Sequence, residues 1–140
     1  MDSFMELRVK NRLDEQTEAL INSVIGVAID VHRELGSGYF EKVYEQVMSI
    51  ELKSRGFVCS TQVPIAVYYK GVKIRGQILD LVVEKRLVLE IKSVDTILPI
   101  HEAQILSYLK STGLVAGLLI NFKERLVKDG IKRFVRTSHH

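Results

Sequence analysis

The spacing of apolar side chains predicts two helices in the first part of the chain. Between residues 14 and 35, apolar side chains recur every three or four positions, as on one face of an amphipathic helix. The small residues 36–38, Gly-Ser-Gly, interrupt this pattern. A second helical pattern then continues to Gly56, a residue type that commonly ends helices. We expect this second helix to bury its apolar positions, which are Val43, Val47, Ile50 and Leu52.

After residue 56 the pattern changes to a period of two, which predicts strands. β-branched and aromatic residues alternate with polar ones from residue 57 to residue 93, and a meander of three antiparallel strands fits turns at Lys70–Gly71 and around Lys85. Pro99 suits the first turn of a third helix that ends at Gly113. The apolar run 114–122 then predicts a buried strand, and residues 128–137 predict a last strand.

This order of elements predicts an α/β fold in a single domain spanning residues 1–140. The antiparallel three-stranded meander, a crossover helix and the later strands would form one mixed β-sheet flanked by helices. A chain of 140 residues that is 46% hydrophobic suits one core. We expect the N-terminal stretch of about ten residues and the terminal His139 and His140 to be flexible.

Composition narrows the function classes. The single cysteine, Cys59, excludes an intramolecular disulfide framework and a cysteine-based zinc cluster, and it favours a reducing compartment. Neither a signal peptide nor an apolar run long enough to span a bilayer is recognisable, so we expect a cytoplasmic protein without a membrane partner. The formal net charge of +3 is compatible with nucleic acid as a partner but is too small to establish it.

The hairpin predicted between residues 76 and 93 places charged side chains among apolar ones. If its turn is centred on Lys85, one side is wholly apolar, with the facing pairs Leu79–Ile91, Leu81–Leu89 and Val83–Leu87. On the other side Asp80 lies opposite Glu90, with Cβ atoms about 4.5–5.5 Å apart, and Lys92 projects from the same face. Two carboxylates at that distance repel each other, and Mg²⁺ or Mn²⁺ would compensate their charge. A solvated sheet face is the alternative, and the three residues taken without their neighbours favour it.

Three further positions add weaker signals. Glu41 falls in the first turn of the second helix, where the helix dipole also favours an acidic residue. Gln104 and Tyr108 are four residues apart and share one face of the third helix. Each position has an ordinary structural explanation, but the order of all these residues along the chain is informative.

The motifs in that order are Gly38-x-x-Glu41-x-x-Tyr44, Asp80, Glu90-x-Lys92 and Gln104-x-x-x-Tyr108. Together they resemble the PD-(D/E)XK nuclease superfamily, and specifically its GxxExxY branch. The resemblance runs from the first helix to residue 122 and implies a restriction-endonuclease-like core with the same order of elements. Leu79 departs from the pattern that names the superfamily, in which a proline precedes the aspartate.

The resemblance also implies roles for these residues. Asp80 and Glu90 would bind Mg²⁺ or Mn²⁺ together with the main-chain carbonyl of Ile91. Glu41 would add a ligand or anchor a water molecule, and Lys92 would orient or help to deprotonate the attacking water. The supporting or substrate-contacting residues would be Gln104, Tyr108 and Tyr44.

The implied function is a metal-dependent nuclease that hydrolyses phosphodiester bonds, in DNA rather than RNA. The alternative is a catalytically silent module on the same fold that binds nucleic acid or protein, and a homodimer or a protein partner stays open in both cases. Phosphate contacts would come from the basic C-terminal stretch, which a solvated face explains equally well; the candidates are Lys123, Arg125, Lys132, Arg133 and Arg136. We interpret the scattered aromatic residues as core or cross-strand packing rather than a base-stacking platform; they are Phe57, Tyr68, Tyr69, Phe122 and Phe134.

Overall fold

The computed structural model describes residues 13–136, in which helices and strands follow the predicted order. The ends that we expect to be flexible lie outside these described residues. The elements are α2 (Glu15–Leu35), α3 (Glu41–Ser54), β1 (Cys59–Tyr69), β2 (Val72–Val83), β3 (Leu87–Lys92), α4 (Pro99–Thr112), β4 (Ala116–Asn121), the 3-10 helix η1 (Val127–Gly130) and β5 (Ile131–Val135).

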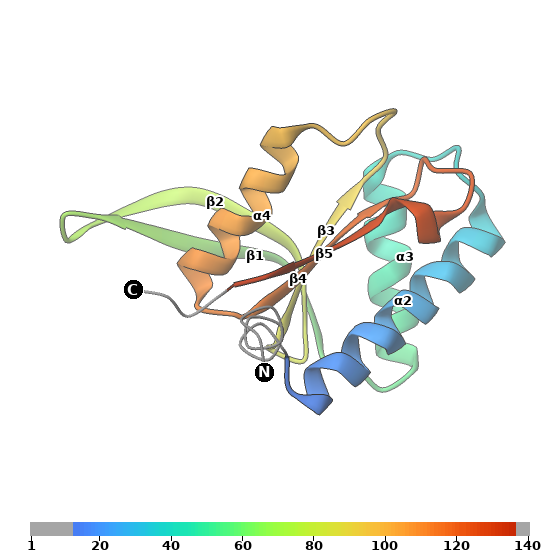
Figure 1. The fold of residues 1–140 in the computed structure, drawn as a ribbon, viewed down its shortest axis with the longest axis horizontal. Helices are drawn as coiled ribbons and strands as arrows, with labels where there is room; N and C mark the ends of the chain where they lie inside the picture. Colours follow the sequence, from blue (N-terminus) through green and yellow to red (C-terminus); the bar gives the residue numbers. More distant parts are fainter. Residues whose placement is uncertain (1–12, 137–140) are drawn as a thin grey trace, which may run out of the picture.

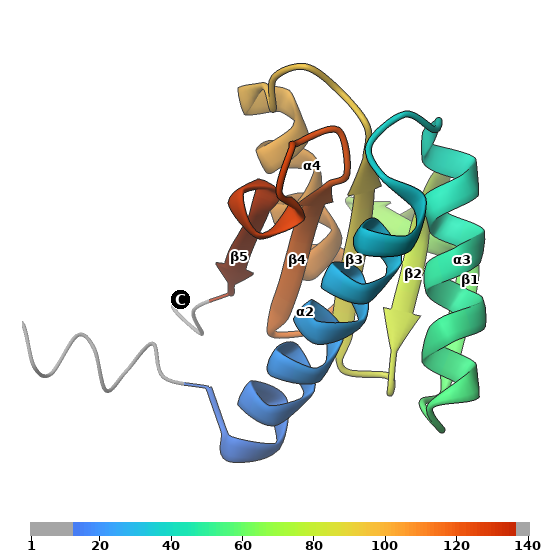
Figure 2. The same ribbon diagram turned by 90° about the vertical axis from the view of Figure 1, so that its right-hand side faces the viewer.

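One five-stranded mixed sheet forms the middle layer of the fold (Figure 1). Its strands lie in the order β1-β2-β3-β4-β5, and among the described strands β3 and β4 are the parallel pair. Helix α4 makes the crossover between those two strands. Helices α2 and α3 cover one face of the sheet and α4 covers the other (Figure 2). The predicted α/β fold, with a mixed sheet flanked by helices, is confirmed.

Helix α2 begins and ends where its local chemistry favours a boundary. Asp14 caps its N-terminus, because Oδ1 of Asp14 accepts a hydrogen bond of 2.7 Å from the N–H of Thr17. Gly36 follows the last turn with a φ of +77°, a conformation that favours glycine. Although α2 is 21 residues long, no helix within residues 13–136 is both long and apolar enough to cross a membrane.

The face that helix α3 buries was predicted only in part: Leu52 is buried and Val47 packs against the core, as expected. Its buried apolar residues lie four apart along the helix and are Tyr44, Met48 and Leu52. Ile50 is 65% exposed and Val43 is 37% exposed, so the prediction is wrong for these two residues. The buried stripe contains the larger side chains, and its tyrosine stacks on Phe122 with ring centroids 4.4 Å apart.

Two hydrophobic clusters fill the two faces of the sheet. Leu81 packs in the cluster beneath α2 and α3, whereas Leu79 packs in the cluster beneath α4. The prediction of one wholly apolar hairpin side is therefore wrong for Leu79. Gln62 lies between the β1 partners of these two leucines and has a φ of +49°, so the strand pair turns at this point and presents a different face.

The β2–β3 turn holds two non-glycine residues in the left-handed region. Glu84 and Lys85 have φ values of +56° and +54°, and the N–H of Arg86 donates to the carbonyl of Val83 at 3.0 Å. This geometry fits a type I′ turn, which prefers glycine at its second central position.

We expect Lys85→Gly to raise the free energy of unfolding by about 0.5–1 kcal/mol, because relief of strain outweighs the greater freedom of glycine in the unfolded chain. Thermal unfolding beside Lys85→Ala tests this, since alanine keeps the strain and should bring no gain. A glycine variant no more stable than the alanine variant would contradict the prediction.

Candidate active site

The predicted register of the β2–β3 hairpin is confirmed near its turn. The backbone pairs are Leu81–Leu89, Val82–Val88 and Val83–Leu87, as expected for a turn centred on Lys85. Beyond the Leu81–Leu89 pair, a side chain replaces a backbone partner. Oδ2 of Asp80 accepts a hydrogen bond of 2.9 Å from the N–H of Ile91. The N–H of Asp80 donates to Oε1 of Glu90 at 3.3 Å. The two carboxylates therefore lie side by side where the backbone pairing of β2 and β3 ends.

Burial makes this pair of carboxylates difficult to ionise fully. Burial first, and then the charge of Asp80, raises the pKa of Glu90 to about 8. Burial also raises the pKa of Asp80. Lys92 gives partial compensation, since its Nζ lies 4.0 Å from Oε2 of Glu90 and its side chain is only 16% exposed. Carboxylate oxygens are the ligands that Mg²⁺ and Mn²⁺ prefer, so these donors fit a divalent cation.

Helix α3 brings two further carboxylates toward the pair, one of which the sequence analysis missed. Glu41 is partly exposed, and its charge adds to the effect of burial in raising the pKa of both Asp80 and Glu90. Glu45 lies one turn later, is 7% exposed and accepts a hydrogen bond from Nε2 of Gln62. Residues four apart share a helix face, and this spacing could have identified the second acid from the sequence.

These carboxylates do not close into a compact metal cluster. Among residues 13–136, no group of three or more His, Cys, Asp and Glu side chains is placed to hold a metal ion. The roles of Glu41 and of the Ile91 carbonyl as ligands therefore stay predictions.

Tyr44 fixes the loop that leads into α3. It is fully buried, and its hydroxyl donates to the carbonyl of Gly36 at 2.6 Å and accepts from the N–H of Tyr39 at 3.1 Å. The carbonyl of Tyr39 accepts in turn from Oγ of Ser93, just after β3. Tyr44 therefore links the start of α3 to the strand that carries Glu90, and a fully buried side chain does not reach substrate.

We expect Tyr44→Phe to lower the free energy of unfolding by about 0.5–1.5 kcal/mol, because the hydroxyl's two partly buried hydrogen bonds, to the Gly36 carbonyl and from the Tyr39 N–H, are lost. The phenyl ring keeps its stacking on Phe122, so the change isolates the hydroxyl. Chemical denaturation measures the loss, with Tyr69→Phe as a control at an exposed tyrosine. Equal stability of the two variants would show that the hydroxyl has no such role.

Helix α4 borders the carboxylates from the other face of the sheet. Tyr108 is 6% exposed, and burial, followed by the charges of Glu90 and Asp80, raises the pKa of its phenol. Tyr108 also packs in the same hydrophobic cluster as Leu79 and Val88, which flank the acids in β2 and β3. Gln104 lies one turn earlier on α4 and is partly buried.

Asn121, which the sequence analysis also missed, fixes the segment after β3. It is 1% exposed and pairs with Lys92 in the parallel β3–β4 ladder. Its Oδ1 accepts from the N–H groups of Val94 and Lys123 at 3.1 and 3.2 Å, and its Nδ2 donates to the carbonyl of Val94 at 2.9 Å. The sequence did contain a signal for this role, because Asn121 is the polar residue at the end of an otherwise apolar strand.

Most of the predicted phosphate-contacting cations are engaged with other groups. Arg136 donates to the carbonyls of Gly113 and Leu114, and Arg125 is exposed. The other three form ion pairs, which are Lys123–Asp95 at 2.8 Å, Lys132–Glu102 at 2.6 Å and Arg133–Glu18 at 2.9 Å. These contacts compete with phosphate, so the proposed role of the five residues stays a prediction.

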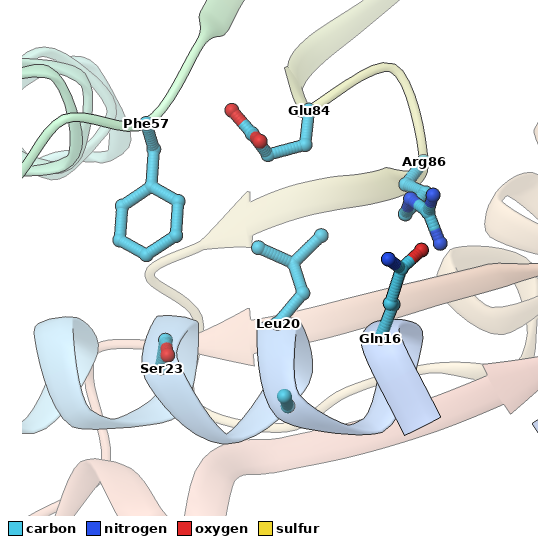
Figure 3. A pocket seen from close by; sticks show the side chains of 7 residues that line it. Gln16, Leu20, Ser23, Phe57, Glu84 and Arg86 are labelled. Carbon is cyan, nitrogen blue, oxygen red and sulfur yellow. The ribbon is translucent and has the colours of Figure 1, made fainter. Parts of the chain in front are cut away.

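The hollow drawn in Figure 3 is separate from the paired carboxylates. It has a volume of about 380 Å³ and lies between α2 and the β2–β3 turn, where Leu20, Phe57, Glu84 and Arg86 line it. Glu84 follows Asp80 by four residues, which is roughly 13 Å of extended chain. The catalytic candidates therefore lie elsewhere on the same two strands.

Comparisons with known proteins identify the family. No curated protein matches this chain significantly. A solved structure, "Crystal structure of SSO0001", is 25% identical, with a TM-score of 0.47, and the match covers 69% of this chain but only 48% of that chain. A family model for the PD-(D/E)XK nuclease superfamily matches residues 18–134. Members of that superfamily are generally nucleases, which act on nucleic acids and typically use divalent metal ions. Because the match extends from α2 to β5 and includes the paired carboxylates, this chain belongs to the PD-(D/E)XK nuclease superfamily, and its mixed sheet is consistent with a restriction-endonuclease-like fold.

Proposed function

We propose that the protein is an Mg²⁺- or Mn²⁺-dependent nuclease that hydrolyses phosphodiester bonds in DNA. The observation that supports this most is the convergence of Asp80 and Glu90 beside Lys92 at the end of the β2–β3 pairing. A buried pair of like charges is unfavourable by itself, and a cation would remove the repulsion.

In this proposal the residues of the site divide the work. Asp80 and Glu90, with the Ile91 carbonyl, would hold the cation, and Glu41 would complete the site directly or through a water molecule. A bound divalent cation supplies a water of lowered pKa and stabilises negative charge on the phosphate. The Lys92 ammonium orients the attacking water and offsets the charge that develops on the scissile phosphate. Tyr108 and Gln104 border the site from α4 and support the lysine or contact the substrate.

A nucleic-acid-binding module that does not cut is the second candidate. The observation that favours it is that, within residues 13–136, the acidic side chains do not assemble into a three-ligand cluster. A module of this kind would bind DNA equally well with and without a divalent cation.

A cleavage assay distinguishes the two candidates. Labelled single-stranded, duplex and branched DNA, and RNA of the same sequence, are incubated with Mg²⁺ or Mn²⁺ and either the wild type or Glu90→Ala. We expect the wild type to cut DNA and Glu90→Ala to cut neither nucleic acid. Glu51→Ala is a matched control, because Glu51 and Lys53 repeat the Glu-x-Lys spacing on α3, where Glu51 pairs with Arg55.

Cleavage that persists in Glu90→Ala would show that the activity comes from another site or from a contaminant. Binding of DNA by the wild type, without cleavage by any preparation, would favour the second candidate. Cleavage of RNA in preference to DNA would overturn the proposed substrate.

A further inference from the structure

The β1–β2 hairpin extends well beyond the rest of the sheet. β1 and β2 contain 11 and 12 residues, whereas β3 contains 6 and pairs only with the Leu81–Val83 end of β2. Figure 1 shows the tip of this hairpin projecting away from α2 and α3 and past α4. We call residues 62–78 the arm.

The arm exposes aromatic and apolar side chains. Tyr68 and Tyr69 are each 65% exposed, so the first of the two predicted alternatives, packing in the core, is wrong for both, while cross-strand packing stays a prediction. The predicted packing is confirmed for the three phenylalanines, which are Phe57, Phe122 and Phe134. Two neighbouring residues on a strand point to opposite faces, so the two tyrosines face different sides of the arm.

All the charged residues of the arm are basic. The arm contains Lys70, Lys73 and Arg75 and no acidic residue. The whole chain has 20 basic and 17 acidic residues, so outside the arm 17 basic residues are balanced by the 17 acidic ones. The arm by itself therefore has a formal charge of +3.

A groove of about 530 Å³ separates the arm from α4. Its lining includes Ile65, Val67 and Tyr68 from the arm, and Tyr108 and Lys110 from α4. Tyr108 packs in one hydrophobic cluster with Leu79 and Val88, which are close in sequence to Asp80 and Glu90, so one end of the groove approaches the candidate active site. Lys73 pairs with Tyr68 across the hairpin, and paired residues share a face, so a cation lies beside the exposed ring.

We infer that this groove holds an unpaired stretch of nucleic acid strand, with a base stacked on Tyr68 and a phosphate bound by Lys73. The inference rests on the proposed nuclease function and specifies its substrate as one with a single-stranded segment. A basic groove with an accessible aromatic face is the usual design for single strands, because paired bases in a duplex do not expose a face for stacking. A second copy of this chain is a poorer occupant of the groove. In a symmetric dimer formed through the arm, the basic residues of the two arms would lie close together and repel each other.

The chain offers a matched control for this inference. Tyr69 is as exposed as Tyr68 but lies outside the lining of the groove, and the Lys70 amine lies over its ring at 5.4 Å from the centroid. Fluorescence anisotropy in EDTA, where cleavage is blocked, measures the affinity for a labelled single-stranded oligonucleotide and for its blunt duplex. The proteins compared are the wild type, Tyr68→Ala, Tyr68→Phe, Tyr69→Ala and Lys73→Gln.

Tyr68→Ala should weaken single-strand binding by about tenfold to a hundredfold, whereas Tyr68→Phe and Tyr69→Ala should bind like the wild type. Lys73→Gln should lower the slope of log affinity against log salt by about 0.7, the value for one phosphate contact on a single strand, and Tyr68→Ala should leave that slope unchanged. Equal melting temperatures of the variants would show that the fold is intact.

Equal affinity of Tyr68→Ala and Tyr69→Ala for the single strand would overturn the inference, as would a wild type that binds only the duplex. A concentration-dependent dimer in sedimentation, dissociated by Tyr68→Ala, would assign the arm to self-association instead. None of these results concerns cleavage. A wild type that cuts nothing in the assay with Mg²⁺ or Mn²⁺ would instead count against the proposed function.

Discussion

We expect Lys92→Met to lower the rate of the proposed DNA cleavage by about 10²–10⁴-fold, the range for removal of one general acid–base group. Methionine keeps a flexible apolar stem of similar length but has no ammonium group. Lys92 lies 4.0 Å from Glu90, so its loss removes the charge nearest to the paired carboxylates. A cation held by Asp80 and Glu90 does not require the lysine, and the rise in melting temperature on addition of Mn²⁺ should therefore persist.

Single-turnover cleavage of a labelled oligonucleotide measures this effect at saturating metal. Lys53→Met is the matched control, since Lys53 follows Glu51 with the same spacing but on a helix, where the two side chains point to different faces. If the Lys92→Met variant cleaved at a rate near that of the wild type, the lysine would have no role in the reaction. Loss of metal-induced stabilisation in the same variant would assign the lysine to the structure of the site.

Glu90→Gln should stabilise the protein in EDTA, and increasingly so as the pH rises. The pKa of Glu90 is about 8 in the folded protein, against 4.5 for the free side chain. At pH below 4.5 both folded and unfolded wild type keep the proton. Between 4.5 and 8 only the unfolded state releases it, so the wild type loses stability relative to the neutral glutamine variant, and the full difference is reached above pH 8. We expect a difference of order 1–4 kcal/mol at alkaline pH.

Thermal unfolding in EDTA across this pH range measures the difference, and roughly 2–4 °C of melting temperature corresponds to each kcal/mol. Glu51→Gln is the control, because this carboxylate is exposed and paired with Arg55, and it should gain no stability at alkaline pH. With Mn²⁺ added, the order should reverse, since only the wild type presents two charged ligands. A Glu90→Gln variant less stable than the wild type in EDTA at pH 8 would contradict the burial of a disfavoured charge.

The fold and the register of the central hairpin were predictable because local patterns determine them. A period of two and a turn centred on Lys85 leave one pairing that keeps Leu81 and Leu89 in the core, and this pairing is observed. The same pairing brings Asp80 beside Glu90. The register and the proximity of the two acids could both be predicted because they depend only on residues within the hairpin.

The errors arise where a distant segment decides the outcome. Helix α3 has apolar residues on more than one face, and the partner Phe122 selects the Tyr44 face over Ile50. The ion pair between Arg133 and Glu18 joins opposite ends of the described chain, so periodicity could not show that this arginine is engaged. The two tyrosines of the arm end an apolar run, residues 65–69, that is typical of a buried strand, but each is 65% exposed in the described structure.

The central place of β3 in the sheet has a consequence for the order in which the protein assembles. The hairpin that carries Asp80 and Glu90 is local in sequence and should form early, whereas the strand that supports Lys92 arrives only after α4. The carbonyl of Lys92 accepts from the N–H of Phe122, and Asn121 fixes the segment that follows. A nascent chain whose β4 is still inside the ribosome therefore carries both acids without a positioned lysine, and the three charged groups come together only when β4 has joined the sheet.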